Sequence, residues 1–414
     1  MTGRGATRAI GAPVDQPRAA TKARRGIKRH HPVRNTLLSI LGALVLIVGG
    51  GATYIYWNIN SNLNTPDIGN LLDTSRPPTH AGTASVRTPG DPWAGQAVNI
   101  LVMGTDSRAG DNANISGADG AEGARSDTTF ILHVSGDRTR VDLVSIPRDI
   151  LITIPKCLKP DGTTVIPEAG WSNMGFNAAF AYGALHGDSN SGAACAIRAV
   201  EAMSNVHIDA FLVADFAGFA AIVDAVGGVD IDLPCAVRSP EAGNLNLPAG
   251  INHLDGDTAT NYMRARKGTG LGDGSDLQRI ARQHELLLNL VNKVLNLNYF
   301  TQFSELYNFA NAAAAAVTTD LGSNVAQLAG FAYSLKNFQL SNMTFHMIPV
   351  ADSGDGAHVV LSKSRDAPIW QALIDDTPLP EDGTTVVAPA ETAPNGSAAT
   401  PIAPSSEASK RQCE

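Results

Sequence analysis

An uncharged apolar run at residues 37–57, LLSILGALVLIVGGGATYIYW, divides the chain and limits what each part can be. About 20 helical residues are enough to cross the hydrocarbon core of a bilayer. The run ends in Tyr54, Tyr56 and Trp57, which are typical of a membrane interface. A cleaved signal peptide is the competing interpretation, but its apolar region spans only about 7–15 residues and ends at an A-x-A site that is not evident here. We therefore expect one uncleaved transmembrane helix at residues 36–57.

Residues 1–35 form a basic arm that predicts the orientation of this helix. The arm carries nine Lys or Arg side chains and one acidic side chain, Asp15. Basic residues remain on the cytoplasmic side of a membrane. We therefore expect a single-pass protein of the cell membrane, with its N-terminus in the cytoplasm and the rest of the chain outside. Because topology accounts for the basic charge, the arm predicts no nucleic-acid partner.

The exterior part divides by composition into three segments. Residues 58–97 are rich in Pro, Gly, Thr and Asn and predict a stalk or linker. Residues 98–376 show strand and helix patterns and predict the folded domain. Residues 377–414 are rich in Pro, Ala, Ser and Thr and predict a disordered tail.

The domain mixes strands with helices. An apolar run at 98–103 predicts a buried strand, and runs at 128–134 and 140–146, separated by the turn SGDR, predict a hairpin. Helical patterns follow at 177–185, 192–204, 216–228 and from 277 onward. This mixture predicts the α/β class, with a central mixed β-sheet flanked by helices as an αβα sandwich behind the N-terminal transmembrane helix.

Four arginines, Arg264, Arg266, Arg279 and Arg282, stand close together in a chain of formal net charge -8. Helical spacing brings Asp276, Arg279 and Gln283 onto one side of a helix, next to an apolar stripe that packs inward, and Arg282 lies further round. Taken alone, this pattern also fits a solvated face with an Asp–Arg pair worth about 0.3–0.5 kcal/mol.

Three other segments place an Arg near an Asp where a predicted strand begins or ends: GTDSR (104–108), RSDT (125–128) and SIPRD (145–149). Ligands of α/β proteins bind at such a sheet edge. In an antiparallel hairpin the start of the first strand lies beside the end of the second, so Asp127 should meet Arg148. The residues expected to share the site are Asp106, Arg108, Arg125, Asp127, Arg148 and Asp149.

Clustered arginines suit phosphate chemistry. Arg presents a planar fork of donors that matches phosphate oxygens, and it stays charged in any surroundings. Several arginines together indicate a ligand with several negative charges, such as a pyrophosphate. A hard dication held by one or two carboxylates and by phosphate oxygens is its usual companion, and Asp106 and Asp127 are the candidate ligands.

Seven motifs follow one another along the chain: NILVMGTDSR, RSDTTFILHV, VDLVSIPRDI, NMGFNAAFAYG, GGVDIDLP, LDGDTATNYMRAR and SDLQRIARQ. In kind and order they resemble the motifs of the LytR-CpsA-Psr family of cell-wall glycopolymer ligases, from residue 98 to about residue 291. The resemblance implies a single anchor and an exported catalytic domain. It also implies a metal-dependent phosphotransferase that takes a glycan from a polyprenyl-pyrophosphate carrier and joins it to peptidoglycan through a phosphodiester.

Carried over motif by motif, the resemblance implies roles for residues of this chain. Asp106 and Asp127 would hold Mg²⁺ or Mn²⁺, and Asp149 is a candidate base beside the catalytic Arg148. The orienting residues would be Asp276 and Asn177. The pyrophosphate ligands would be Arg108, Arg125, Arg148, Arg264, Arg266, Arg279, Arg282 and Gln283.

Three features near these motifs are given other interpretations. His284 stands where the family often has a second Gln, but it falls on the apolar stripe and is interpreted as a core residue. The Gly-rich stretch 268–274 does not follow a strand as a dinucleotide motif would, and we expect it to form a flexible loop that brings Arg264 and Arg266 toward Arg279. Residues 109–124 form either a mobile lid or a solvated loop, and the loop is preferred.

The four cysteines fit an oxidising exterior. We expect Cys157 to pair with Cys195, because both lie beside motif segments of an exported domain. Cys235 would then remain buried and reduced, and Cys413 lies in the tail.

Several alternatives remain open at this stage. The same site would serve a hydrolase that cleaves the lipid pyrophosphate, and a non-catalytic wall-binding or regulatory protein is a third possibility. The apolar stretches 211–223 and 286–297 line a slot for the polyprenyl tail or belong to the core. The Ala/Gly-rich composition and the paired cysteines resemble actinobacterial members, so arabinogalactan is preferred over teichoic acid or capsule as the glycan.

Overall fold

The computed structural model describes residues 49–72, 75–80, 90–105, 125–169, 174–272, 276–297, 301–380, 386–387 and 413. The chain divides into two compact units, Met1–Tyr54 and Ile55–Glu414. In the first unit residues 49–54 are helical, whereas the basic arm and most of the expected transmembrane helix lie outside the described residues. Within the described ranges, no helix is both long enough and apolar enough to cross a membrane.

The second unit is built on a mixed sheet, which among the described residues has seven strands in the order β11-β6-β1-β2-β3-β12-β15. The central strands β1 (Val98–Thr105), β2 (Ser126–Val134) and β3 (Val141–Ser145) are antiparallel neighbours. On either side of them, β6 (Ala210–Asp215) runs parallel to β1 and β12 (Met343–Met347) runs parallel to β3. The edges are β11 (Val317–Thr319) and β15 (Val386–Val387). The sequence predicted the three central strands, and their hairpin is confirmed.

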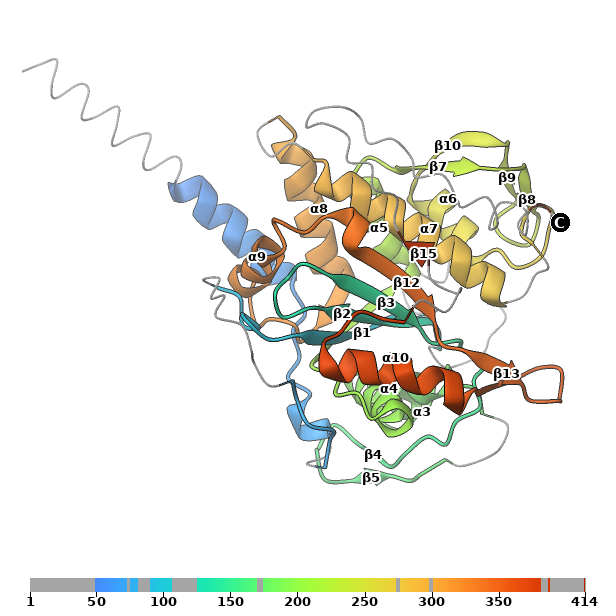
Figure 1. Cartoon of the computed structure of the whole chain (residues 1–414). Coiled ribbons are helices and arrows are strands. Elements are labelled where there is room, and N and C mark those ends of the chain that lie inside the picture. Colours follow the sequence, from blue (N-terminus) through green and yellow to red (C-terminus); the bar gives the residue numbers. More distant parts are fainter. Residues whose placement is uncertain are drawn as a thin grey trace, which may run out of the picture. The chain divides into compact units, whose positions relative to one another are not determined.

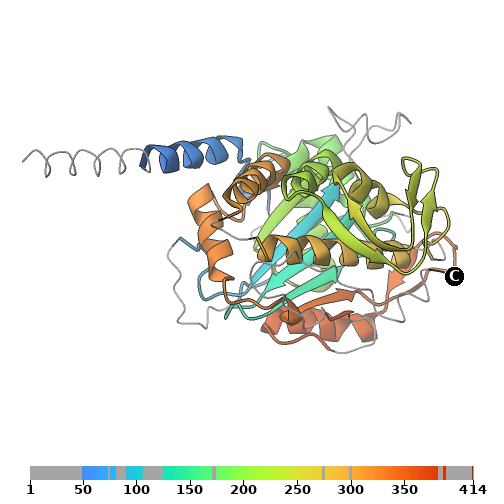
Figure 2. The same cartoon turned by 90° about the horizontal axis from the view of Figure 1, so that it is seen from above.

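Helices cover both faces of this sheet (Figure 1). On one face lie α3 (Ala178–His186), α4 (Ser189–Ser204) and α10 (Lys363–Asp375), and on the other lie α5 (Phe216–Ala225), α7 (Asp276–Leu295) and α8 (Phe303–Ala316). Figure 2 looks down on α7, which crosses the strands. Alternate residues of β1 enter the two cores: Leu101 packs in the core with α3 and α4, and Ile100 packs with Leu288 of α7. The expected sandwich is confirmed for this unit.

A smaller group of strands extends from the α7 side. Here β7 (Val229–Leu233) pairs with β10 (Gly250–Leu254), and β8 (Val237–Ser239) pairs with β9 (Leu245–Leu247). Their side chains share a second core with α5, α7 and α6 (Gly256–Arg264). The last helix before the C-terminal strands, α9 (Val325–Ser334), contributes Phe331 to the sheet core.

Two disulfides join distant parts of the domain. The expected pair is confirmed: Cys157, on the short strand β4 (Cys157–Leu158), is bonded to Cys195 of α4, and both residues are fully buried. The expectation for Cys235 is wrong, because Cys235 is only half-buried and is bonded to Cys413. Cys235 lies on the turn between β7 and β8, where the end of the chain can reach it.

The segment expected to be a stalk contacts the domain along much of its length. Residues 55–62 are helical, and the Tyr307 hydroxyl donates to the Asn58 side chain at 2.8 Å. The Asn62 amide donates to Asn311 at 2.9 Å, and the Asn64 amide donates to Thr318 at 2.9 Å. These bonds hold the start of the segment against α8 and β11.

Candidate functional site

The site begins where β2 starts and β3 has just ended. Antiparallel pairing of Phe130 with Ser145 sets the register of these strands, so residues before Phe130 lie beside residues after Ser145. As predicted, Arg148 meets Asp127: its Nη1 donates to Asp127 Oδ1 at 2.9 Å.

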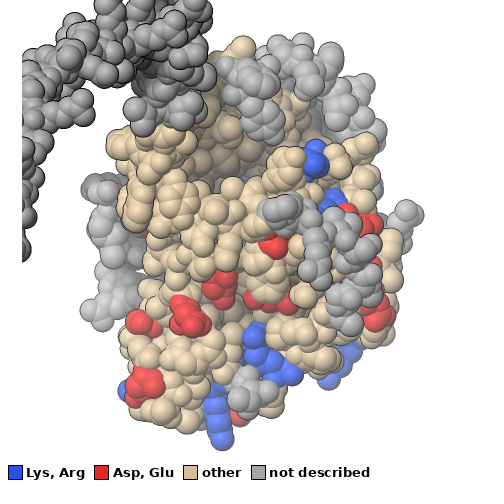
Figure 3. All heavy atoms as spheres, turned by 90° about the vertical axis from the view of Figure 1, so that its left-hand side faces the viewer, with Lys and Arg blue, Asp and Glu red and all other residues tan. Residues whose placement is uncertain are grey.

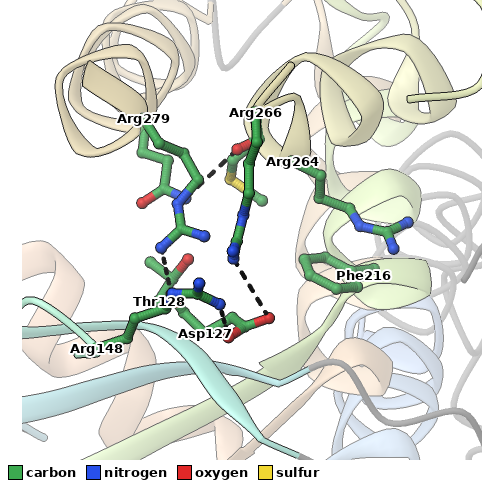
Figure 4. Close-up of a pocket in the computed structure, with 9 residues that line it drawn as sticks. Asp127, Thr128, Arg148, Phe216, Arg264, Arg266 and Arg279 are labelled. Atoms are coloured by element: carbon green, nitrogen blue, oxygen red, sulfur yellow. Dashed lines mark hydrogen bonds and ion pairs between the residues drawn. The ribbon is translucent and has the colours of Figure 1, made fainter. Parts of the chain in front are cut away.

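A pocket of about 250 Å³ opens at this rim (Figure 4). The start of β2, the loop after β3, the first residue of α5, the end of α6 with the loop after it, and the N-terminal half of α7 supply its walls. The described residues that line it are Asp127, Thr128, Arg148, Phe216, Met263, Arg264, Arg266, Arg279 and Gln283. The structure thus brings together six of the residues predicted from sequence, drawn from segments up to 156 positions apart: Asp127, Arg148, Arg264, Arg266, Arg279 and Gln283.

Asp127 is the centre of the charge in this pocket, and three arginines point toward it in Figure 4. Besides the Arg148 ion pair, Arg266 Nη2 lies 3.8 Å from Asp127 Oδ2. Arg279 Nη2 donates to the backbone carbonyl of Asp127 at 3.1 Å. Burial alone would raise the pKa of Asp127, but Arg148, followed by Arg266 and Arg279, lowers it below its ordinary value. Asp127 is therefore ionised at neutral pH.

The opposite wall combines a cation with an aromatic face. Arg264 is the last residue of α6, where a basic side chain interacts favourably with the helix dipole, and its guanidinium lies 4.5 Å from the centre of the Phe216 ring. Gln283 is buried and directs its amide toward the carbonyl of Met263 at 3.4 Å. Phe216 was expected only as part of the apolar stretch 211–223, and Thr128 and Met263 were not predicted, since a single threonine or methionine gives no signal of a site.

Arg148 is supported from behind by the next motif. The backbone amide of Asn177 donates to the backbone carbonyl of Arg148 at 3.0 Å. A Cβ on Gly175 would lie 2.9 Å from the same carbonyl, so only glycine fits there without a shift. Asp149 Oδ1 lies 3.3 Å from Arg148 Nε, and Asp149 is not among the residues that line the pocket. These contacts favour an orienting role for Asp149 and for the backbone of Asn177.

Arg282 and His284 occupy the buried side of α7. Arg282 is not among the lining residues: it is 3% exposed and donates to the carbonyls of Ala265 and Leu271. His284 Nε2 lies 2.7 Å from Ser145 Oγ, and its ring packs on Phe345. Burial lowers the pKa of His284 to about 3, with a smaller contribution from His346, so the ring is neutral. The interpretation of His284 as a core residue is confirmed.

The remaining expected site residues are placed less fully. Arg125 precedes β2, is exposed and is not one of the pocket-lining residues. Asp106 and Arg108 lie outside the described residues. Asp276 opens α7, and nothing is described of its side chain. Among the residues that are described, no three His, Cys, Asp or Glu side chains are grouped as a metal site.

The arrangement suits one kind of ligand. Four guanidinium groups and one carboxylate line the described pocket, which leaves an excess of positive charge in a small and partly dehydrated space. Planar guanidinium donors recognise phosphate oxygens in pairs. A ligand with several phosphate charges would neutralise this excess.

Comparisons with known proteins identify relatives of the chain. The sequence model of the LytR_cpsA_psr family matches residues 72–373. The chain is 28% identical over 411 residues to the cell wall biosynthesis protein LcpA of Corynebacterium glutamicum, covering 90% of this chain and 72% of that protein. It is 27% identical over 267 residues to the polyisoprenyl-teichoic acid–peptidoglycan teichoic acid transferase TagU of Oceanobacillus iheyensis, covering 64% of this chain and 71% of that protein. Its fold is similar to the crystal structure of protein gbs0355 from Streptococcus agalactiae, with a TM-score of 0.50 and 19% identity over 69% of this chain and 90% of the other.

Proposed function

The chain belongs to the LytR_cpsA_psr family, and from that premise we propose that it is a phosphotransferase of the cell wall. It would take a glycan from a polyprenyl-pyrophosphate carrier and join it to peptidoglycan through a phosphodiester. The observation that carries this proposal is the ring of Arg148, Arg264, Arg266 and Arg279 around the pocket that contains Asp127.

The pocket supports a division of labour among these residues. Arg264, Arg266 and Arg279, with Gln283, would neutralise the pyrophosphate in an otherwise acidic domain. Arg148 is fixed by Asp127, Asp149 and the Asn177 backbone, so it would meet the charge that develops on the transferred phosphoryl group with little reorganisation.

A divalent metal ion fits the donor chemistry of the site. Asp127 is an ionised carboxylate on the pocket wall, which is a ligand that Mg²⁺ and Mn²⁺ accept beside phosphate oxygens. Asp127, together with Asp106, would hold the ion, and a bound ion would stabilise negative charge on the phosphate oxygens. Asp127→Ala should then raise the metal concentration that the reaction requires.

A group of partly buried apolar residues on the α7 side of the sheet supports a lipid carrier. Val102 lies on the central strand β1 and faces α7, yet it is only partly buried, as are Leu212, Leu287 and Val291 around it. Central sheet positions are normally closed by the covering helix. Figure 3 shows a hollow on one side of the molecule whose visible walls are mostly uncharged. These residues would receive the polyprenyl tail while the arginines hold its pyrophosphate.

The membrane and the wall polymer complete the proposal. Residues 36–57 would anchor the protein in the cell membrane with the domain outside. Arabinogalactan is the proposed glycan. The match to the cell wall biosynthesis protein LcpA over 90% of this chain supports a polymer of the cell wall as the substrate. A teichoic acid, which TagU transfers by its name, is the second candidate.

The deciding experiment supplies purified full-length protein with a polyprenyl-pyrophosphate glycan, Mg²⁺ and peptidoglycan, and separates the soluble and wall-bound products. A glycan linked to peptidoglycan through phosphate is the expected result. A soluble phosphoglycan alone would instead identify a hydrolase, and an unchanged lipid substrate would favour a wall-binding protein. Repeating the assay with arabinogalactan and teichoic-acid precursors identifies the polymer.

A further inference from the structure

The loop that follows α6 carries part of the arginine cluster, and its described residues pack closely against β8. Residues 265–272 contain Gly268, Gly270 and Gly272, all at positive φ. A Cβ at Gly268 would overlap the Arg238 carbonyl, and one at Gly270 would overlap the Ala236 carbonyl. The glycines therefore permit a close approach of this loop to β8.

The outer side of the loop is tied to β8 by backbone bonds. The amide of Arg238 donates to the Thr269 carbonyl at 3.0 Å, and the amide of Thr269 donates back at 2.9 Å. The hydroxyl of Ser239 donates to the Lys267 carbonyl at 2.7 Å. These contacts position the middle of the loop but do not connect it to the helix that bears Arg279.

Arg282 makes that connection from below. One guanidinium nitrogen, Nη1, donates to the Leu271 carbonyl at 2.6 Å, and Nη2 donates to the Ala265 carbonyl. Ala265 and Leu271 are each 1% exposed, so their carbonyls depend on protein donors instead of water. A single side chain thus joins the two ends of the loop.

The position of Arg282 on α7 gives this bridge a functional meaning. Arg279 and Gln283 lie three residues before it and one residue after it on the same helix, and both line the pocket. Ala265 stands between Arg264 and Arg266, which line the pocket from the loop side. Arg282 therefore sets the distance between the two groups of ligands.

We infer that Arg282 is a positioning residue that fixes Arg264 and Arg266 opposite Arg279, so that the three guanidinium groups face one pyrophosphate together. The inference rests on the proposed function, which supplies the pyrophosphate. It replaces the sequence-based expectation that Arg282 is itself a pyrophosphate ligand.

The test measures binding of inorganic pyrophosphate to the full-length protein in detergent micelles by calorimetry. Arg282→Met keeps the chain length but removes the donors, and it should weaken binding about tenfold. In the Arg264→Ala/Arg266→Ala background the same change should have no further effect, because the residues through which Arg282 acts are gone. Arg238→Met is the matched control: this exposed arginine holds the same loop through its backbone, and its side chain is not needed.

Each outcome discriminates. Equal losses in the parent and in the double-alanine background would overturn the inference and restore Arg282 as a direct ligand. No loss in the parent would overturn the inference and also exclude Arg282 as a ligand. A parent that does not bind pyrophosphate at all would overturn the proposed function. Arg282→Lys retains one cationic donor for the two carbonyls and should recover part of the affinity. If Arg282→Met melts far below the parent, the same cycle is run with Arg282→Lys.

Discussion

Arg148 is the side chain on which the proposed chemistry depends most directly. We expect purified Arg148→Ala to fold normally but to lose on the order of 10²–10³ in transfer rate, as when one donor to a transition state is removed. The pKa of Asp127 should rise in this variant, since Arg148 is the strongest of the three arginines that lower it.

The assay for Arg148→Ala is transfer of a lipid-pyrophosphate glycan to peptidoglycan with Mg²⁺, beside a melting curve. Arg140→Ala is a suitable comparison. Arg140 precedes β3 whereas Arg148 follows it, and Arg140 pairs with Asp142 and Asp376, away from the pocket residues. If Arg148→Ala melts like the parent and transfers at the parental rate, the proposed site is wrong.

Glu285 gives the domain a pH-dependent stability. Burial raises its pKa from 4.5 to about 7, against the opposing effects of the Tyr262 hydroxyl and Arg282. A carboxyl whose pKa is raised by folding binds more protons in the folded state. It therefore leaves the free energy of unfolding unchanged below pH 4.5 and lowers it increasingly as the pH rises to about 7. The difference corresponds to at most about 3 kcal/mol.

We therefore expect Glu285→Gln to be more stable than the parent at pH 8 and similar to it at pH 4.5. Urea unfolding at both pH values measures this difference. Glu305→Gln is the control, because Glu305 is not buried and its pKa is lowered, not raised. A Glu285→Gln variant with the same stability gain at both pH values would show that the pKa of Glu285 is not raised in the folded protein.

At the scale of elements, the loop glycines separate two effects of substitution. Gly227 and Gly270 both have positive φ, which costs an alanine about 1–2 kcal/mol. An added Cβ meets nothing within 4 Å at Gly227, whereas at Gly270 it overlaps the Ala236 backbone. Gly227→Ala should therefore lose only the stability that the positive φ costs, and it should retain transfer activity.

Gly270→Ala should lose more stability than Gly227→Ala and should also lose activity, because the loop that carries Arg266 must move away from β8. Chemical unfolding and the transfer assay, run on both variants, provide the comparison. Equal stability and equal activity in the two variants would mean that the loop is not held against β8.

The elements that the sequence predicted are those whose signal is local. The hairpin follows from two apolar strands around a short turn, and its register alone was enough to place Asp127 beside Arg148. β6 was missed because residues 211–223 read as one apolar run. Inside that run Asp215 accepts a hydrogen bond from the Gly218 amide at 2.7 Å, and this cap ends the strand and starts α5.

Helix α7 shows why the rest of the site required the structure. Two apolar residues of this helix, Ala281 and Leu295, are exposed. Arg279, Arg282 and Gln283 are buried instead. Arg279 and Gln283 point into the pocket, and the loop of residues 265–272 covers Arg282. The four arginines look alike in sequence, and only their tertiary neighbours separate the lining residues from the bridge.

At the scale of the whole molecule, covalent links join segments that secondary structure does not. Removing the link between β4 and α4 with Cys157→Ser/Cys195→Ser should destabilise the domain by roughly 3–4 kcal/mol, since the bond closes a loop of 38 residues in the chain-entropy model. Denaturant unfolding of parent and variant measures the loss, and the parent with reductant should approach the variant. The comparison pair is Cys235→Ser/Cys413→Ser, which releases the C-terminus but leaves the core disulfide intact. A core variant as stable as the parent would contradict the prediction.

The docking of residues 58–97 decides how far the domain can act. As a free tether, these 40 residues could extend to about 130 Å and let the domain sweep a broad shell around its attachment point. Instead, Asn58 is bonded to Tyr307, Arg76 forms an ion pair with Glu201 at 2.6 Å, and Asp91 pairs with Arg138 at 3.1 Å. These contacts hold the segment against the surface of the domain, so most of its length is not free to extend. In the proposed topology little free tether would remain between the anchor and the domain, so the lipid carrier and the wall acceptor would both have to come to the domain.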